Sequence, residues 1–439
     1  MTFKGRPVTR KIVIMHQIKT RPVQSEVSIR VPGSKSYTHR LMIAAALSNG
    51  VCQIRNPLHS EDTWLTKGAL QQMGIRIDDH PSALLIFGNS GRLKACAEPI
   101  HLGNSGTSMR LLSGVAILGE GEYLFTGSER MCERPMQSLL DSLNQIGVPA
   151  RSQDATGCPP IIVPGGGVSR QHAILDCSTS SQYLSALLLA APCLPEGLVI
   201  DVSKGPVSRP YIDMTLDIMS HFGVMVARDG YTHFEIPGNQ TYAAGDHEVE
   251  SDGSQAGYFW AAGAITGARV KVLGVLPGSR QGDVGLAEVF AQMGCRVDYD
   301  PDGIAVRGDK LRAVEVDMGN MPDMVPTLAV VAAFAEGTTI MRNVAHLRAK
   351  ESDRLAATSQ ELTRMGILTF CGPDELRVTG GLPHGAEIQT YNDHRIAMAF
   401  AVAGLKVQGV VITDEHCVAK SFPNYWEVFE RLYGIEDER

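Results

Sequence analysis

The sequence lacks the cysteine pattern of a disulfide-bonded or zinc-binding protein. Its nine cysteines are an odd number, they are spread from Cys52 to Cys417, and no two of them form a C-x-x-C pair. Structural disulfides come in pairs, and zinc knuckles use closely spaced cysteines. We therefore predict reduced thiols in a cytoplasmic protein without a metal site.

Long apolar runs are also missing. The Ala- and Leu-rich stretch from Leu184 to Ala191 stops at Pro192, far short of the roughly 18 residues that a membrane helix needs. We therefore expect no membrane partner. The first 21 residues are basic but contain no apolar core followed by a cleavage site, and they predict a disordered leader rather than a signal peptide.

An excess of positive charge is absent as well. The chain has 40 Lys and Arg against 47 Asp and Glu, a formal charge of -7, whereas nucleic-acid-binding proteins usually present a strongly basic face. We expect no nucleic-acid partner. Small anionic ligands remain possible, because a locally basic cleft can occur in an acidic protein. The length of 439 residues allows two or three domains.

A pattern that occurs six times organises the chain. Each copy is an amphipathic segment that ends in an apolar residue, followed by glycine and then an apolar or β-branched residue. The marker glycines lie 73, 76, 71, 72 and 68 residues apart and are Gly74, Gly147, Gly223, Gly294, Gly366 and Gly434. A near-constant period over six copies indicates internal repeats. Each copy predicts a helix, a glycine in the left-handed cap conformation, and a strand.

A second, more apolar helix is expected upstream of each amphipathic one. Segments such as "SGTSMRLLSGVAIL" and "MVPTLAVVAAFAEG" are apolar or small nearly all round, which is typical of helices buried on most sides. Strand-like runs follow them. We predict an α/β fold of six pseudo-repeats in two lobes of three, with the Gly- and Asp-rich stretch 242–255 as the crossing point. One large sheet with coincidental spacing is the alternative, and six matches disfavour it.

Charged and polar clusters fall at the expected starts of these helices. Helix N-termini present unpaired N–H groups and partial positive charge, which favour anions. Cations from separate repeats can converge only if the lobes face each other, so the sequence predicts an anion-binding cleft between them. Each residue also has an ordinary explanation, because Ser, Asn or Asp at a helix start is usually an N-cap and a single Arg is usually solvated. The prediction depends on the whole set.

Eight motifs in order resemble those of the 5-enolpyruvylshikimate-3-phosphate synthase family. They are "VPGSKSYTHR", "LGNSGTSMR", "ERPM", "SSQYLSALL", "SRPYIDMT", "AKESDRL", "TYNDHRIAMAFAV" and "AKSFPNYWE". The resemblance covers nearly all of the chain from about Val27 onward. It implies a two-lobed inside-out α/β barrel with six pseudo-repeats of βαβαββ type, three per lobe. It also implies a discontinuous domain I (residues 1–33 plus 251–439) and a domain II (residues 34–250).

The resemblance implies a set of substrate-binding residues, carried over position by position. Those expected to bind shikimate 3-phosphate are Lys35, Ser36, Arg40, Ser180, Ser181, Gln182, Ser208, Asp323 and Lys350. Those expected to bind phosphoenolpyruvate are Lys35, Gly106, Arg134, Gln182, Arg354, Arg395 and Lys420. The two substrates carry two phosphates and two carboxylates, which accounts for so many Lys and Arg side chains.

The implied reaction moves the enolpyruvyl group of phosphoenolpyruvate to the 5-hydroxyl of shikimate 3-phosphate and releases phosphate, in the shikimate pathway of aromatic amino acid biosynthesis. One carboxylate as base and another as acid suits these proton transfers. We expect Asp323 as base and Glu351 as acid, with Lys35 able to share proton transfer. Glu351 could instead be a first-turn helix carboxylate paired with Lys350 or Arg354. The resemblance implies no cofactor and inhibition by glyphosate beside Gly106. The oligomeric state does not follow from the sequence, and we expect a monomer.

Four residues depart from the pattern common in the family: Ser105, Leu111, His346 and Cys132. Leu111 leaves the degree of glyphosate sensitivity open, and we leave His346 out of the site. Two other functions remain. One is the sister family that transfers enolpyruvate to UDP-N-acetylglucosamine, whose reactive Cys corresponds to Glu129 here. The other is a non-catalytic anion-binding scaffold.

Overall fold

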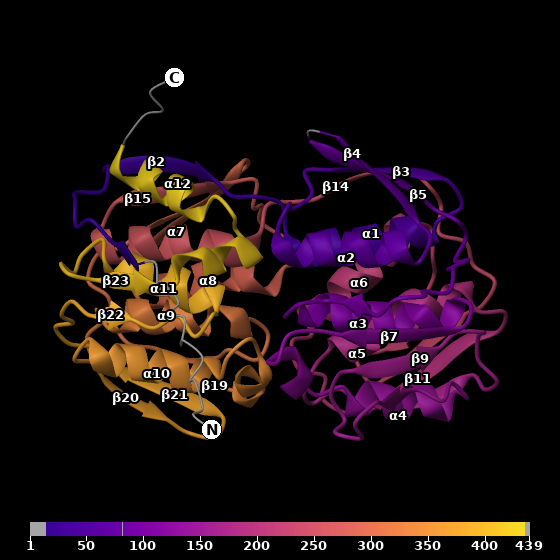
Figure 1. Cartoon of the computed structure of the whole chain (residues 1–439). Helices are drawn as coiled ribbons and strands as arrows, with labels where there is room; N and C mark the ends of the chain where they lie inside the picture. The colour runs from indigo at the N-terminus through magenta and orange to yellow at the C-terminus, as the bar shows by residue number, and fades with distance from the viewer. Residues whose placement is uncertain (1–14, 81, 435–439) are drawn as a thin grey trace, which may run out of the picture.

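The computed structural model describes residues 15–80 and 82–434, which form two lobes side by side (Figure 1). One hydrophobic core extends from Tyr37 to Val249 and defines the middle lobe. The other combines residues 18–31 with residues 256–432 and defines the terminal lobe. In the described part of the chain, no helix is long and apolar enough to cross a membrane.

The middle lobe has three four-stranded sheets, with the orders β14-β3-β5-β4, β6-β7-β9-β8 and β10-β11-β13-β12. Its strands are β3 (Val51–Arg55), β4 (Arg76–His80), β5 (Ala83–Phe87), β6 (Ile100–His101), β7 (Glu122–Thr126), β8 (Arg151–Ser152), β9 (Ile161–Pro164), β10 (His172–Asp176), β11 (Gly197–Lys204), β12 (Ala227–Asp229), β13 (His233–Pro237) and β14 (Asp246–Glu248). Its α-helices are α1 (Lys35–Leu47), α2 (Glu61–Gln72), α3 (Gly106–Val115), α4 (Gln137–Gln145), α5 (Gln182–Ala190) and α6 (Pro210–His221). Its 3-10 helices are η1 (Ala116–Leu118), η2 (Met131–Glu133) and η3 (Ala191–Cys193).

The terminal lobe has sheets of the orders β16-β17-β15-β2, β18-β19-β21-β20 and β1-β23-β22. Its strands are β1 (Met15–Gln17), β2 (Glu26–Arg30), β15 (Arg269–Leu273), β16 (Arg296–Asp300), β17 (Gly303–Arg307), β18 (Glu315–Asp317), β19 (Thr338–Arg342), β20 (Leu368–Cys371), β21 (Glu375–Thr379), β22 (Glu387–Ile388) and β23 (Val411–Thr413). Its α-helices are α7 (Gly253–Thr266), α8 (Leu286–Gln292), α9 (Val325–Ala332), α10 (Arg354–Arg364), α11 (His394–Ala403) and α12 (Tyr425–Glu430). Its 3-10 helices are η4 (Gly282–Gly285), η5 (Pro322–Met324), η6 (Ala345–Ala349), η7 (Glu415–Lys420) and η8 (Arg431–Tyr433).

The six repeats are built on one plan. In three of them the chain runs strand, helix, strand, helix and two further strands without interruption: β6 to β9, β10 to β13, and β18 to β21. The repeats that begin at α1 and α7 take their first strand from elsewhere, because β14 pairs parallel with β3 and β2 pairs parallel with β15. The predicted βαβαββ type is confirmed in five repeats. The sixth has a sheet of three described strands, β22, β23 and the distant β1, so three of the six repeats are completed by distant parts of the chain.

The sixth repeat corrects the prediction for the N-terminus. Residues 15–17 form β1 and pair antiparallel with β23, Met15 opposite Thr413, so this part of the expected leader is an ordered strand. The sequence lacks alternating hydrophobicity there, and the edge of β23 supplies the pairing instead. Residues 1–14 of the expected leader lie outside the described residues.

The marker glycines adopt the predicted backbone conformation. All six have φ between 78° and 101°, in the left-handed region that glycine reaches without a steric penalty. Five directly follow the C-cap residue of an amphipathic α-helix, and Gly434 is the C-cap of η8. The prediction of six glycine helix stops is therefore confirmed.

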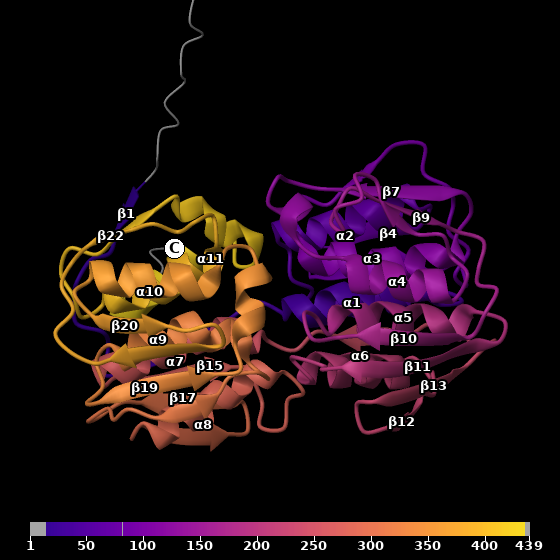
Figure 2. The same cartoon turned by 90° about the horizontal axis from the view of Figure 1, so that it is seen from below.

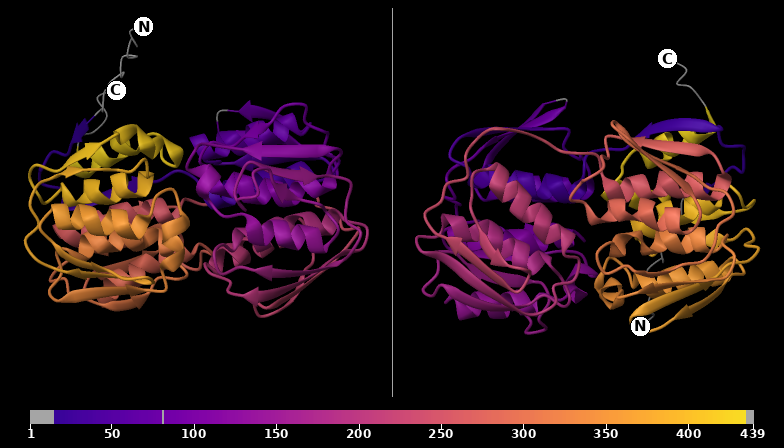
Figure 3. Two further views of the ribbon diagram at one scale, coloured as in Figure 1. Left: turned by 60° about the horizontal axis from the view of Figure 1, so that its bottom comes forward. Right: turned by 180° about the vertical axis from the view of Figure 1, so that it is seen from behind.

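The apolar helices lie inside the lobes, with the sheets outside them (Figures 2 and 3). Every residue of α3 and of α9 is buried. A Cβ at Gly114 of α3 would stand 2.6 Å from the Cβ of Ala186 in α5, so only a glycine allows these two helices to pack so closely. The chain passes between the lobes twice, and a bridge between Gly33 and Ser251 holds the two passages together.

Candidate active site

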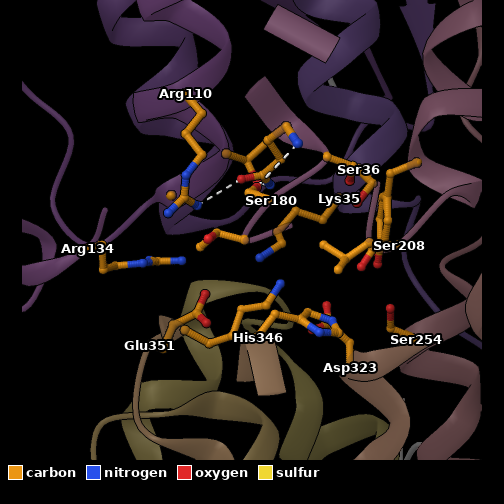
Figure 4. A pocket seen from close by; sticks show the side chains of 18 of the residues that line it. Lys35, Ser36, Arg110, Arg134, Ser180, Ser208, Ser254, Asp323, His346 and Glu351 are labelled. Carbon is orange, nitrogen blue, oxygen red and sulfur yellow. Dashed lines mark hydrogen bonds between the residues drawn. The ribbon is translucent and has the colours of Figure 1, made fainter. Parts of the chain in front are cut away.

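A cavity lies at the boundary between the lobes, where Lys35 and Arg134 face Asp323 and Glu351 (Figure 4). The middle lobe contributes Lys35, Ser36, Gly106, Thr107, Arg110, Arg134, Thr179, Ser180, Ser181, Gln182, Val207, Ser208 and Tyr211. The terminal lobe contributes Asp252, Ser254, Asp323, His346, Lys350, Glu351, Arg354 and Arg395. Six of these side chains are Lys or Arg and three are Asp or Glu, so the walls carry a net positive charge.

Helix starts position many of these residues. Lys35 is the first residue of α1, Gly106 of α3, Gln182 of α5 and Arg354 of α10. Because the first N–H groups of a helix have no partner within the helix, these starts add donors and partial positive charge to the cavity. The predicted meeting of helix N-termini and cationic side chains at the boundary between the lobes is confirmed.

Asp62 joins two predicted cations from different lobes. Its carboxylate accepts from Lys35 Nζ at 2.9 Å and from Lys420 Nζ at 2.5 Å. Lys420 also donates to the carbonyl of Asn104 at 3.0 Å. Burial raises the pKa of Asp62, but the two ammonium groups outweigh it and hold that pKa at about 2. Lys35 and Lys420 are therefore neighbours, although Lys420 is not part of the cavity lining.

Arg134 is held against the start of α3. Its Nη1 donates to the carbonyl and side-chain oxygens of Asn104 at 3.0 and 3.1 Å. A Cβ at Gly106 would stand 2.4 Å from Nη2 of Arg134, so the absence of a side chain there makes room for this guanidinium. Arg110, on the next turn of α3, donates to Oε1 of Gln182 at 2.9 Å.

Arg354 is the centre of an ion-pair network in the terminal lobe. Its three nitrogens donate to Asp393 at 2.8 Å, to Asp323 at 2.8 Å and to Glu351 at 2.6 Å. Nη2 of Arg395 donates to the second oxygen of Asp323 at 2.6 Å. Bidentate and shared guanidinium bonds of this kind fix carboxylate orientation.

These cations lower the pKa values of the two carboxylates expected to act as base and acid. Burial raises the pKa of Asp323, but Arg395, Lys350 and Arg354 outweigh it and hold the pKa well below its usual range. Burial likewise raises the pKa of Glu351, and the neighbouring cations, Arg354 first, again hold it well below normal. Both side chains are ionised at neutral pH.

Two further groups have pKa values shifted mainly by burial. Burial lowers the pKa of Lys350 from 10.5 to about 8, so this lysine keeps its charge at pH 7 and loses it in mildly alkaline solution. Burial lowers the pKa of His346 to about 4, so its ring is neutral. His346 lines the cavity, although we left it out of the expected site.

Asp283 lies behind the cavity. Its Oδ2 accepts from the hydroxyls of Ser254 and Tyr211, both of which line the cavity, the second at 3.4 Å. Among the described residues, its buried Oδ1 has no hydrogen-bond partner. Burial and the nearby Asp323 raise the pKa of Asp283 to about 7.

The structure brings together nearly all the predicted site residues. Apart from Arg40 and Lys420, all of them line the cavity. Arg40 lies behind the wall, where it donates to the carbonyl of Ser36 at 3.0 Å and to Thr215 at 2.7 Å. Sequence reasoning missed Arg110, Tyr211 and Ser254. Arg110 and Tyr211 lie within two of the eight motifs that resemble the family, and that position was the available signal.

Three of the departing residues lie outside the lining. Ser105 is the N-cap of α3, Leu111 is buried in the core, and Cys132 lies on η2. Within residues 15–80 and 82–434, no group of three or more His, Cys, Asp and Glu side chains is arranged to hold a metal ion.

Comparison with known proteins gives consistent matches over nearly the full length. A model of the family described as EPSP synthase (3-phosphoshikimate 1-carboxyvinyltransferase) matches residues 18–429. The 3-phosphoshikimate 1-carboxyvinyltransferase of Syntrophobacter fumaroxidans is 44% identical over 410 residues, which are 93% of this chain and 97% of that protein. The protein of the same name from Shewanella piezotolerans is 41% identical over 424 residues, 95% of this chain and 100% of the other.

Solved structures agree with the sequence matches. The EPSP synthase from Acinetobacter baumannii has a TM-score of 0.80 at 29% identity and covers 95% of this chain and 98% of its own. The enolpyruvyl transferase NikO from Streptomyces tendae has a TM-score of 0.73 at 20% identity, a likeness of fold. These matches confirm the two-lobed inside-out fold and favour the shikimate 3-phosphate enzymes over the sister family. The chain belongs to the EPSP synthase (3-phosphoshikimate 1-carboxyvinyltransferase) family.

Proposed function

We propose that this protein transfers the enolpyruvyl group of phosphoenolpyruvate to the 5-hydroxyl of shikimate 3-phosphate and releases phosphate. The observation that carries the proposal is the cavity between the lobes, whose lining has six cationic side chains and three carboxylates. The two substrates together bring two phosphates and two carboxylates, so cations in excess of the protein's own carboxylates are what the pair requires.

The substrates divide the cavity between them. Shikimate 3-phosphate binds the hydroxyl groups of Ser180, Ser181 and Ser208 through its phosphate, and Asp323 and Lys350 through its ring hydroxyls. Phosphoenolpyruvate binds at Arg134 and in front of Arg354, Arg395 and Lys420, with Lys35 between the two ligands. Support comes from the shared placement of these side chains at one lobe boundary.

Asp323 is the base and Glu351 the acid. Asp323 takes the proton of the 5-hydroxyl as that oxygen attacks C2 of phosphoenolpyruvate, and the methylene carbon takes a proton from Glu351. The Glu351 carboxylate then takes back a proton from the methyl group of the adduct, the C–O bond to phosphate breaks, and the double bond is restored. The departing phosphate takes the proton that Asp323 holds, which returns both carboxyl groups to their starting states. The four acidic groups of the substrates offset the cations around Glu351 and raise its pKa toward the range that an acid needs.

We also propose that domain I comprises residues 1–33 and 251–439, and domain II residues 34–250. The bridge between Gly33 and Ser251 supports both boundaries, because the two chain passages meet there. The separation of the two hydrophobic cores supports the same division.

A phosphate-release assay with both substrates tests the function. We expect release only when both are present, and a product with the mass of shikimate 3-phosphate plus enolpyruvate. Release with UDP-N-acetylglucosamine in place of shikimate 3-phosphate would point to the sister reaction. Tight binding of both substrates without phosphate release would point to a scaffold.

A further inference from the structure

Arg130 lies outside the cavity lining and still connects the two lobes. It belongs to the middle lobe, immediately before η2. Its Nη2 donates to the backbone carbonyls of Arg348 and Lys350 in the terminal lobe at 3.2 and 3.0 Å, and its Nε donates to the carbonyl of Lys350 at 3.2 Å. A guanidinium fork that holds two carbonyls of one segment, two residues apart, fixes both the location and the orientation of that segment.

The segment that Arg130 holds carries cavity residues. Lys350 and Glu351 follow η6 directly, and His346 lies on η6 itself. Carbonyl groups at the end of a helix have no partner within it and carry partial negative charge. A positively charged donor at this position therefore stabilises the end of η6 and the residues that follow.

The same short element carries Arg134 into the cavity. Arg130 and Arg134 are the two residues that flank η2, so the distance between them is set by a single 3-10 turn. One end of η2 binds the backbone just before Glu351, and the other end presents a buried guanidinium whose charge lowers the pKa of Glu351. The Arg130 contacts thus set how Arg134 and Glu351 face each other across the lobe boundary.

We propose that Arg130 is a positioning residue that fastens the Arg348–Glu351 segment to the middle lobe and so places Lys350 and Glu351 for the reaction. This inference rests on the proposed function. The competing explanation is a surface ion pair, because Arg130 also donates to Glu133 at 2.8 Å and its side chain is 34% exposed. Exposed ion pairs contribute little to stability.

Steady-state kinetics of Arg130→Ala test the proposal. We expect kcat to fall by about 10- to 100-fold, since small displacements of reacting groups have effects of this size. Arg130→Lys keeps the charge but loses the fork and should recover only part of the rate. Guanidinium chloride at low concentration should restore part of the activity of Arg130→Ala and none of that of Glu351→Gln.

Two control variants separate the explanations. Arg151→Ala removes an exposed arginine of the same lobe that contacts Glu122 at 3.5 Å, and Glu133→Gln removes the surface partner of Arg130 while the bonds to the terminal lobe remain. We expect wild-type kcat from both. A fall in kcat for Glu133→Gln equal to that for Arg130→Ala would overturn the proposal in favour of the surface pair.

A double-mutant cycle with Glu351→Gln completes the test. If Arg130 acts by placing Glu351, its loss should cost much less in the Glu351→Gln background than in the wild type. Equal fold-changes in both backgrounds would overturn the proposal. A wild-type protein that releases no phosphate would contradict the proposed function itself, whereas an active wild type with a fully active, folded Arg130→Ala would contradict only this inference.

Discussion

The two walls of the cavity hold their arginines in different ways. In the middle lobe, Arg110 and Arg134 donate to amide and carbonyl oxygens of Gln182 and Asn104, which are neutral groups. In the terminal lobe, Arg354 and Arg395 are bound to carboxylates. An anion can bind the first pair without separating an existing ion pair, whereas at the second it must compete with Asp323 and Glu351. The middle-lobe wall therefore suits binding, and the terminal-lobe wall suits proton transfer.

The largest effect is expected from substitutions of the carboxylates in the terminal-lobe wall. Asp323→Asn or Glu351→Gln should slow turnover by about 100-fold or more, as for other general acid–base groups. Substrate binding should change much less, because the middle-lobe cations stay in place. Rapid-quench rates beside calorimetric binding of shikimate 3-phosphate measure both. Near-wild-type turnover in both variants would remove the acid and base assignment.

The next prediction concerns pH and Lys350. Because its pKa is about 8, Lys350 loses its charge as the pH rises through that value, and kcat/KM for shikimate 3-phosphate should fall by about tenfold per pH unit above it. Lys350→Arg stays charged and should move this decline to higher pH. The same decline in Lys350→Arg as in the wild type would show that another group titrates.

A smaller effect is expected at the middle-lobe wall. Gly106→Ala places a methyl group against the Arg134 guanidinium, so KM for phosphoenolpyruvate should rise by about tenfold. Inhibition by glyphosate should weaken in parallel. Gly68→Ala is the control, because a Cβ there meets nothing within 4 Å. An unchanged KM in Gly106→Ala would mean that Arg134 moves aside freely.

The smallest effect concerns stability rather than rate. Because the pKa of Asp283 is raised from 3.8 to about 7, the folded protein keeps a proton that the unfolded chain releases, and this contribution to stability is lost as the pH rises through 7. Asp283→Asn avoids the loss. Its advantage in melting temperature over the wild type should grow by a few degrees between pH 5 and pH 8. A constant difference across that range would contradict the assignment.

Features of this fold that depend on neighbouring residues were predictable from the sequence. Contacts between residues that are distant in the sequence were not. The six glycine stops and the apolar helices follow from patterns within about 15 residues, since backbone conformation and burial of one face are local properties. Asp62 and Asp283 gave no such signal, because their importance comes from Lys420 and Asp323, which are distant in sequence. Arg40 is the opposite case: its motif predicted a substrate-binding residue, but it lies behind the wall and donates to the carbonyl of Ser36. The expected monomer and cytoplasmic location stay predictions.

The strands that complete a repeat from a distant part of the chain have a consequence for folding during synthesis. All elements of the middle lobe lie between residues 35 and 248, so that lobe is complete once this stretch has left the ribosome. The terminal lobe can be completed only later in synthesis. Strand β2 pairs with residues 269–273, and β1 pairs with residues 411–413, which are made after the middle lobe. Strand β1 is made before the middle lobe and is thus among the last strands to be incorporated, and half of the cavity exists well before the other half.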